Sequence, residues 1–332
     1  MAATRVSGWV PDVLGEHFEQ LTLPLRPDSQ GDVVATLVRY SPPFTLGFSR
    51  GPATNADVLY VHGWSDYFFQ TELAEYWHRA GARFYAIDLR KYGRSLRDYQ
   101  TPGFITDLAD YDEDIEAALA VIDHAPGTRN KRPLILMGHS TGGLTFSLWA
   151  DRNPGRVAAL VLNSPWLEFQ ASGVGRAAIL PIVEIGARVD PFAALPNVDL
   201  GFYTRTVSAE LDGAWTYNVA WRPPRGFTTH PAWLRAVLAG HTKVANGLSI
   251  DAPVLTMISA RSLLLPKWTP EMKSVDVVLR VDDIAVRATR LGPSVTIDRI
   301  DGALHDIFLS TERVRQKGYG QLTRWLTGYL PR

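Results

Sequence analysis

The chain has 332 residues, of which 46% are hydrophobic and 20% charged, a composition typical of a globular protein with a substantial core. Its 34 Lys and Arg residues balance 34 Asp and Glu residues without a long run of one sign, which argues against nucleic acid or an anionic membrane as the main partner. Cysteine is absent, which excludes disulfides, thiolate metal sites and a cysteine nucleophile.

No segment of the sequence has the pattern of a membrane anchor. The N-terminal stretch MAATRVSGWVPDVLGEHFEQ lacks the apolar core of a signal peptide. No apolar stretch approaches the ~20 residues that are needed to cross a bilayer. We therefore expect a cytoplasmic protein without stable membrane insertion.

In chain order, the first predicted element is a hairpin over residues 18–41, whose two apolar stretches flank the turn-rich sequence PDSQG. Short apolar runs then alternate with helical patterns. The predicted strands cover 57–63, 82–90, 132–138, 157–164, 252–259 and 293–300, and the clearest helices cover 104–125 and about 311–329. This alternation predicts an α/β fold, in which a mostly parallel sheet has helices on both faces and the N-terminal hairpin forms an antiparallel edge.

One long stretch, from Trp166 to Leu248, interrupts the alternation of strands and helices. It is rich in proline and aromatic residues, as in PFAALPNVDLGFYTRT, and the strand series resumes after it. We interpret residues 166–248 as an inserted helical cap over one end of the sheet. Residues 1–165 and 249–332 then form the core domain.

The apolar stretch LILMGHSTGGL ends in a serine that stands between glycines. Gly138-x-Ser140-x-Gly142 lies where a predicted strand ends and a helix begins. The tight turn that presents a catalytic serine requires small neighbours at these positions. The alternative is a plain strand-to-helix turn in which small residues relieve crowding. The strand–turn–helix context favours Ser140 as a nucleophile.

A serine hydroxyl is inert at neutral pH unless a base takes its proton. In this architecture the base follows late in the chain, after the last strand. Among the eight histidines, His305 in IDGALHDIFLS stands at that position, just past the strand that is predicted to end near Ile300. We therefore predict that His305 is the base.

A carboxylate must orient the imidazole and stabilise its charged form. The best candidate is Asp276, which precedes an apolar pair and then a predicted helix. Asp282 and Asp283 stay open as alternatives, although they also fit the N-cap and first turn of that helix. Glu168, which follows the strand at 157–164, is a further alternative.

The oxyanion formed by serine attack needs preorganised N–H donors. We expect one donor to be the backbone N–H of Thr141, directly after the nucleophile. The other is the N–H of Trp64, in the loop that follows the strand DVLYVHG. The alternative interpretation of His62-Gly63 is a simple turn that ends the strand.

Five segments together resemble the α/β-hydrolase superfamily, particularly its branch of monoacylglycerol-lipase, lysophospholipase and serine-aminopeptidase-like enzymes. In chain order they are VHGWSDYF, AIDLRKYGRS, LMGHSTGG, DVVL and GALHDIFLS. The resemblance runs from about Asp57 to the C-terminus, apart from the cap. It implies the α/β-hydrolase fold and a serine hydrolase that acts through an acyl-enzyme, without metal or cofactor.

The sequence departs from this family at two places. Lys91 stands where members often have glycine. The acid commonly lies at the end of its strand, whereas Asp276 trails Ser259 behind an apparent insertion, ARSLLLPKWTPEMKS.

Such enzymes select substrates through the cap, so we expect the acyl group to contact residues 166–248. Trp166 and Phe169, directly after a predicted strand, are the expected substrate contacts. We predict hydrolysis of small-molecule carboxylic esters with an apolar or lipid-like acyl group. The same triad also supports thioester, amide, lactone or carbon–carbon hydrolysis. From another class, a ligand-binding receptor on a hydrolase fold is the alternative.

Overall fold

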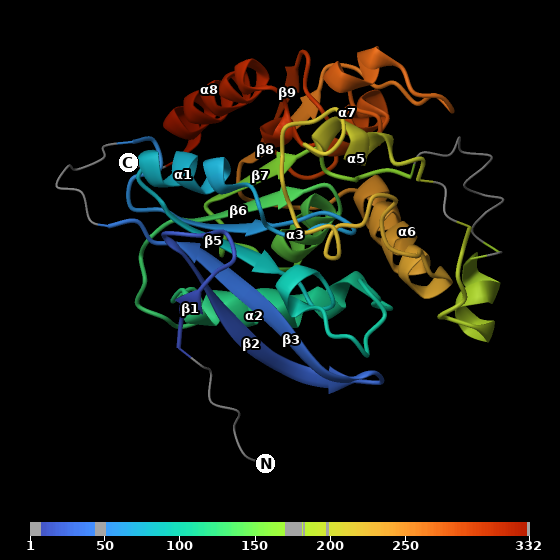
Figure 1. The fold of residues 1–332 in the computed structure, drawn as a ribbon. Helices are drawn as coiled ribbons and strands as arrows, with labels where there is room; N and C mark the ends of the chain where they lie inside the picture. Colours follow the sequence, from blue (N-terminus) through green and yellow to red (C-terminus); the bar gives the residue numbers. More distant parts are fainter. Residues whose placement is uncertain (1–7, 44–50, 170–180, 182, 197–198, 331–332) are drawn as a thin grey trace.

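A mixed β-sheet runs through the centre of the protein in a computed structural model, which describes residues 8–43, 51–169, 181, 183–196 and 199–330 (Figure 1). Within these residues the sheet has nine strands in the order β1-β2-β3-β5-β4-β6-β7-β8-β9. The strands are β1 (Val10–Pro11), β2 (Phe18–Asp28), β3 (Gly31–Tyr40), β4 (Asp57–Val61), β5 (Arg83–Asp88), β6 (Leu134–His139), β7 (Ala159–Asn163), β8 (Val254–Ser259) and β9 (Val295–Ile300). The neighbours from β5 to β9 pair in parallel, and β1, β2 and β3 add the antiparallel edge.

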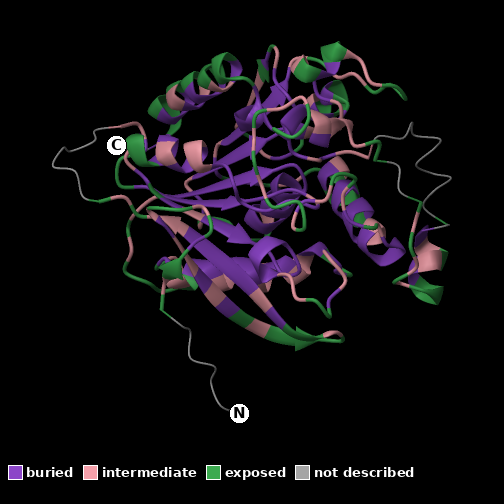
Figure 2. Ribbon diagram, viewed as in Figure 1, coloured by how far each residue is buried: buried purple, intermediate pink, exposed green. Residues whose placement is uncertain are grey.

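The central strands are buried on both faces, which explains their nearly continuous apolar sequences. Successive side chains of a strand point to opposite faces of the sheet. On β4, Val58 and Tyr60 therefore join one apolar cluster, while Leu59 and Val61 join the other. Figure 2 shows the resulting band of buried strands across the molecule.

Helices cover both faces of the sheet. On one face, α1 (Thr71–Arg79) and α8 (Glu312–Tyr329) pack with the cluster that contains Val58. On the other, α2 (Tyr111–Val121), α3 (Thr141–Arg152) and α7 (Val281–Ala288) pack with the cluster that contains Leu59. Short 3₁₀ turns are η1 (Gly93–Ser95), η2 (Leu108–Asp110), η3 (Pro270–Ser274) and η4 (Ile307–Leu309). The predicted fold class is confirmed.

One predicted helix begins later than expected. The sequence predicts a helix over 104–125, but α2 starts at Tyr111 after the short turn η2. The Asp107 side chain accepts a hydrogen bond from Ala109 N–H at 2.9 Å and caps η2. Phe104 is not part of the helix. Its ring stacks on Phe192, with ring centroids 4.0 Å apart. Tertiary packing outweighs the helical pattern in this stretch.

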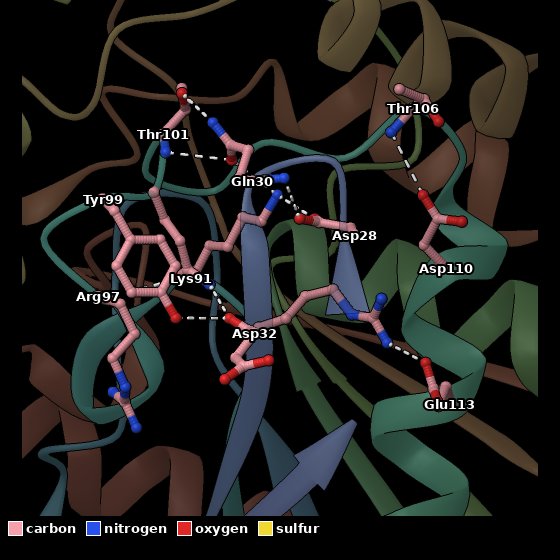
Figure 3. A network of polar contacts seen from close by, with 12 residues as sticks. Asp28, Gln30, Asp32, Lys91, Arg97, Tyr99, Thr101, Thr106, Asp110 and Glu113 are labelled. Atoms are coloured by element: carbon pink, nitrogen blue, oxygen red, sulfur yellow. Dashed lines mark hydrogen bonds and ion pairs between the residues drawn. The ribbon is translucent and has the colours of Figure 1, made fainter. Parts of the chain in front are cut away.

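The turn of the β2–β3 hairpin is held by the loop after β5 (Figure 3). Lys91, which is fully buried, places Nζ 2.5 Å from Asp28 Oδ2 and donates to Gln30 Oε1 at 2.9 Å. Gln30 Nε2 in turn donates to Thr101 Oγ1 at 2.8 Å. Lys91, which stands where family members often have glycine, therefore joins the β2–β3 hairpin to the loop that leads toward α2.

The segment between β7 and β8 contributes α5 (Phe202–Val207) and α6 (Pro231–Asn246), and residues 183–189 are also helical. Trp233 and Val237 of α6 pack in the same apolar cluster as Leu144 of α3. Figure 2 shows α6 with buried and exposed sides, as this packing requires. None of the helices within the described ranges is long and apolar enough to cross a membrane.

Candidate active site

Ser140 occupies a strained turn between β6 and α3. Its φ of 51° and ψ of −117° lie in a region that costs a non-glycine residue about 1–3 kcal/mol. The neighbouring glycines are needed because space is short. A Cβ on Gly138 would lie 2.6 Å from Gly142 O, and a Cβ on Gly142 would lie 2.3 Å from His62 O. The turn thus requires residues without a side chain two positions before and two positions after Ser140.

His305 meets the Ser140 hydroxyl from the loop that follows β9. The distance from His305 Nε2 to Ser140 Oγ is 3.1 Å, and both side chains are buried. This contact joins two residues that are 165 positions apart in the sequence. The imidazole lies where it can accept the hydroxyl proton.

Asp276 faces the other nitrogen of the same imidazole. Asp276 Oδ2 lies 2.9 Å from His305 Nδ1, while Oδ1 accepts hydrogen bonds from Val278 N–H at 2.7 Å and Leu279 N–H at 2.8 Å. A carboxylate only accepts, so His305 Nδ1 is the donor and Nε2 is left free to accept from Ser140.

The insertion before Asp276 forms a loop that returns to its starting point. Ser262 and Asp276 form an isolated β-bridge, with Leu263 N–H donating to Asp276 O at 2.8 Å and Asp276 N–H to Arg261 O at 3.0 Å. Residues 263–275 therefore leave the end of β8 and come back to it. This explains why Asp276 trails its strand in sequence and still lies close to the strand end.

The other candidate acids have different partners. Glu168 pairs with the guanidinium of Arg287. Asp282 and Asp283 lie exposed in the first turn of α7, and the N-cap is Arg280 rather than either of them. Asp282 pairs with Arg299 and Asp283 with Arg280, at 2.7 and 3.3 Å. The structure brings only Asp276, among these four, to the His305 ring.

The two expected oxyanion donors belong to segments that adjoin Ser140. Thr141 is the first residue of α3, where a backbone N–H has no partner within the helix. In the loop after β4, a Cβ on Gly63 would lie 3.0 Å from Ser140 Cβ, so the chain that leads to Trp64 approaches the nucleophile closely. The loop is held in place by Ser65 Oγ, which accepts a hydrogen bond from Phe227 N–H at 3.0 Å.

Three comparisons with known proteins find relatives of this chain. The family described as serine aminopeptidase, S33, matches residues 52–208. The chain is 26% identical over 276 residues to a monoacylglycerol lipase of Mycolicibacterium smegmatis, which covers 82% of this chain and 88% of that protein.

Solved structures show the same fold. A monoacylglycerol lipase of Paleococcus ferrophilus matches with a TM-score of 0.61 at 18% identity, covering 84% of this chain and 96% of that one. A soluble variant of the monoglyceride lipase of Saccharomyces cerevisiae gives 0.61 at 15% identity, covering 99% and 97%. The chain belongs to the α/β-hydrolase superfamily. It is a serine hydrolase that is similar to the monoacylglycerol-lipase-like branch, the branch that its sequence motifs indicate.

A cluster of aromatic side chains begins beside the turn that holds Ser140 in this hydrolase. Trp166 N–H donates to Ser140 O at 2.9 Å, and its ring lies 6.4 Å from Phe169 and 6.1 Å from Trp233. Trp233 of α6 also approaches Trp64, with ring centroids 3.7 Å apart. The predicted substrate contacts therefore lie in one aromatic cluster that includes the proposed oxyanion loop.

The sequence did not predict a buried ion pair between Asp66 and Arg222, which lies beside the Tyr203 ring that contacts His305. Arg222 Nε lies 3.2 Å from Asp66 Oδ1, and both side chains are almost fully buried. Burial raises the pKa of Asp66 to about 7, against the opposing effect of the Arg222 charge. The Arg222 guanidinium covers the Tyr203 ring, whose edge-to-face contact with His305 has a centroid distance of 5.2 Å. No spacing in the sequence indicates this contact between the two segments.

Within the described residues, no group of three or more His, Asp and Glu side chains is arranged to hold a metal ion.

Proposed function

We propose that this hydrolase cleaves carboxylic esters of apolar or lipid-like acyl groups through an acyl-enzyme. Ser140 is the nucleophile, His305 the base and Asp276 the acid of the proposed triad. The observation that carries the proposal is the continuous chain of contacts from Ser140 Oγ to His305 Nε2, at 3.1 Å, and from His305 Nδ1 to Asp276 Oδ2, at 2.9 Å. All three side chains are buried, which removes competing water.

The proposed reaction has two halves. Ser140 Oγ attacks the ester carbonyl carbon while His305 Nε2 takes the hydroxyl proton. The backbone N–H groups of Trp64 and Thr141 stabilise the oxyanion. The tetrahedral intermediate collapses, His305 gives its proton to the departing alcohol, and an ester now joins the acyl group to Ser140. Water then attacks this ester with His305 as base, which releases the acid and restores Ser140.

We assign the acyl group of the substrate to the aromatic cluster formed by Trp166, Phe169 and Trp233. Trp166, whose N–H donates to Ser140 O, supplies apolar surface together with the Phe169 and Trp233 rings beside it. The relatives named above are lipases of monoacylglycerols or monoglycerides, which supports an apolar acyl chain. We further propose that residues 166–248 form the cap over this site and that residues 1–165 and 249–332 form the core.

Substitution of the nucleophile tests the proposal. Ser140→Ala should abolish hydrolysis of p-nitrophenyl butyrate and labelling by a fluorophosphonate, with a loss of about 10⁶-fold in kcat. Ser147→Ala is the matched control, because Ser147 is a buried serine of α3 whose Oγ donates to Gly143 O at 2.7 Å. It should keep both activities. Activity that survives in Ser140→Ala, or a folded wild-type protein that shows neither activity, contradicts the proposed function.

A panel of substrates tests the type of bond. Matched butyrate ester, thioester, amide and lactone substrates should rank the ester first in kcat/KM. A higher kcat/KM for any of the other three identifies the bond that the same triad cleaves instead.

A further inference from the structure

Asn163 connects the nucleophile turn to the histidine loop. It is the last residue of β7 and is fully buried. Its backbone oxygen accepts Ser140 N–H at 3.0 Å and lies 3.1 Å from His139 Nδ1. Its side chain reaches in the other direction, where Nδ2 donates to Asp306 Oδ1 at 2.7 Å and Oδ1 accepts Ile307 N–H at 3.2 Å. One residue therefore fixes the backbone of Ser140 and the two residues that follow His305.

Asp306 is a buried carboxylate with neutral donors. Besides Asn163 Nδ2, it accepts Phe308 N–H at Oδ1, at 2.9 Å, and Gln70 Nε2 at Oδ2, at 3.1 Å. Across the described ranges, no Lys or Arg side chain forms an ion pair with it. Since a buried charge is costly unless hydrogen bonds satisfy it, these three donors hold the carboxylate in one position.

Gln70 extends the connection to a third element. It precedes α1, and its Oε1 accepts Phe69 N–H at 3.0 Å while Nε2 also lies 3.3 Å from Tyr60 OH on β4. Gln70 is buried as well. The Asp306 carboxylate is thus held from β7 through Asn163 and from the β4–α1 region through Gln70, which are rigid parts of the core.

We propose that Asn163 and Asp306 are positioning residues that set the separation between Ser140 and His305. The proposal rests on the proposed function, since it assigns these two residues a role in that triad. The direct contact between Ser140 Oγ and His305 Nε2 joins a rotating hydroxyl to a ring on a loop. The hydrogen bonds that Asn163 accepts from Ser140 N–H and Ile307 N–H restrict this freedom. A misplacement of about 1 Å costs on the order of 10²-fold in rate.

Two other buried hydrogen bonds hold the same loop without reaching the nucleophile turn. Ser259 Oγ donates to Ala303 O at 2.7 Å, and Leu304 N–H donates to Ser310 Oγ at 2.9 Å. These bonds maintain the fold of the loop but do not connect it to Ser140. Ser310→Ala is therefore the matched control, because it removes the hydrogen bonds of Ser310 Oγ with Leu304 N–H and with the Asp306 backbone oxygen, at 3.5 Å, and leaves both side-chain bonds of Asn163 intact.

The test measures kcat and KM with p-nitrophenyl butyrate for Asn163→Ala, Asp306→Ala and the double variant. Each single variant should lower kcat by about 10- to 100-fold with KM within about threefold of wild type. The rate of Ser140 labelling by a fluorophosphonate should fall in parallel. Because both residues act through one connection, the double variant should be about as slow as the slower single variant. Ser310→Ala should keep kcat within about threefold.

Several outcomes overturn the proposal. Wild-type kcat in Asn163→Ala, fully multiplicative effects in the double variant, or an equal loss in Ser310→Ala each show that this connection does not set the geometry. Thermal melting establishes that the variants are folded at the assay temperature. Where Asn163→Ala does not fold, Asn163→Ser provides the same comparison, because a serine side chain is too short to reach Asp306. Loss of activity in Ser140→Ala together with normal activity in Asn163→Ala refutes this inference alone.

Discussion

Asp276 illustrates how single residues act in this site. Its Oδ1 is occupied by two backbone N–H groups, so the carboxylate cannot rotate, and its Oδ2 faces the imidazole at 2.9 Å. An amide in this place presents an NH₂ group either to backbone donors or to His305 Nδ1. In the first orientation the N–H groups of Val278 and Leu279 lose their acceptor, and in the second His305 Nδ1 loses its acceptor. A buried donor without an acceptor is costly.

Asp276→Asn should therefore lower kcat by about 10³- to 10⁴-fold, because the imidazole loses the partner that fixes its tautomer. Steady-state kinetics on p-nitrophenyl butyrate measures this loss. Asp282→Asn and Glu168→Gln serve as controls and should stay within about tenfold of wild type. A loss in Glu168→Gln as large as that expected for Asp276→Asn assigns the acid to Glu168.

His139 gives a pH dependence of stability. Burial lowers the pKa of His139 from 6.5 to about 4. Between these two values the unfolded chain binds a proton at this residue that the folded chain does not, so the free energy of unfolding falls as the pH falls from 6.5 to 4. The contribution is at most about 1.4 kcal/mol per pH unit.

His139→Gln should reduce this slope, because glutamine does not titrate and keeps an amide donor for Asn163 O. Urea unfolding at several pH values across the window measures the difference between variant and wild type. Parallel stability curves for the two proteins contradict the assignment of the slope to His139.

The residues that the sequence could identify are those with a fixed place in the chain order. Ser140 ends a strand, His305 follows the last strand, and such positions are visible in a one-dimensional pattern. Two other contacts form only in the folded chain, and no sequence motif links their partners. They join Asn163 to Asp306 and Asp66 to Arg222. Their roles depend on which strand ends are neighbours, and that information is contained in the sheet order.

At the scale of elements, the parallel strands were predictable because burial on both faces leaves a continuous apolar signature. The first residues of the helices were harder to predict than the strands. The helical pattern from Phe104 to Leu108 is real, but Phe104 packs against Phe192 of a distant segment and Asp107 caps the turn η2. The acidic pair in TDLAD, with Asp107 and Asp110 three residues apart, was the local signal for a later start.

The hairpin-to-loop contact gives an element-scale prediction. Lys91→Met should lower the free energy of unfolding by about 1–3 kcal/mol, because the hairpin turn loses the buried ammonium that joins Asp28 and Gln30 (Figure 3). The kcat should change by less than about threefold, since Lys91 does not contact the proposed triad.

Urea unfolding and kinetics on the same samples separate the two effects. Arg26→Met is the matched control, because Arg26 is a highly exposed cation of the hairpin whose pairing with Glu113 contributes at most about 1 kcal/mol. Equal destabilisation by the two variants contradicts a special role for Lys91.

Across the whole molecule, the segment between β7 and β8 contacts the loop after β4 at two places. Residues 218–227 are bound to the loop after β4: Asn218 N–H donates to Tyr67 OH at 2.7 Å, Arg222 pairs with Asp66, and Phe227 N–H donates to Ser65 Oγ. At the second place α6 contributes Trp233, which contacts Trp64 through rings alone. Polar bonds dominate the first contact and aromatic rings the contact with Trp64, where we propose that the acyl chain lies.

Replacement of Trp233 by leucine tests this division of the site. Trp233 is buried between Trp64 and Trp166, so a smaller side chain leaves apolar space beside the acyl carbon. Trp233→Leu should raise kcat/KM for the laurate ester relative to the butyrate ester by about tenfold, since each added methylene in an apolar pocket contributes about 1 kcal/mol or more. A series of p-nitrophenyl butyrate, octanoate and laurate measures the shift.

Phe192→Ala removes another aromatic ring of the same segment, one that stacks on Phe104 rather than on Trp64. It should leave the ratio of laurate to butyrate hydrolysis unchanged. A similar shift in Phe192→Ala indicates that loosening the segment as a whole alters chain-length preference. An unchanged ratio in Trp233→Leu places the acyl chain elsewhere than the space between Trp64 and Trp166.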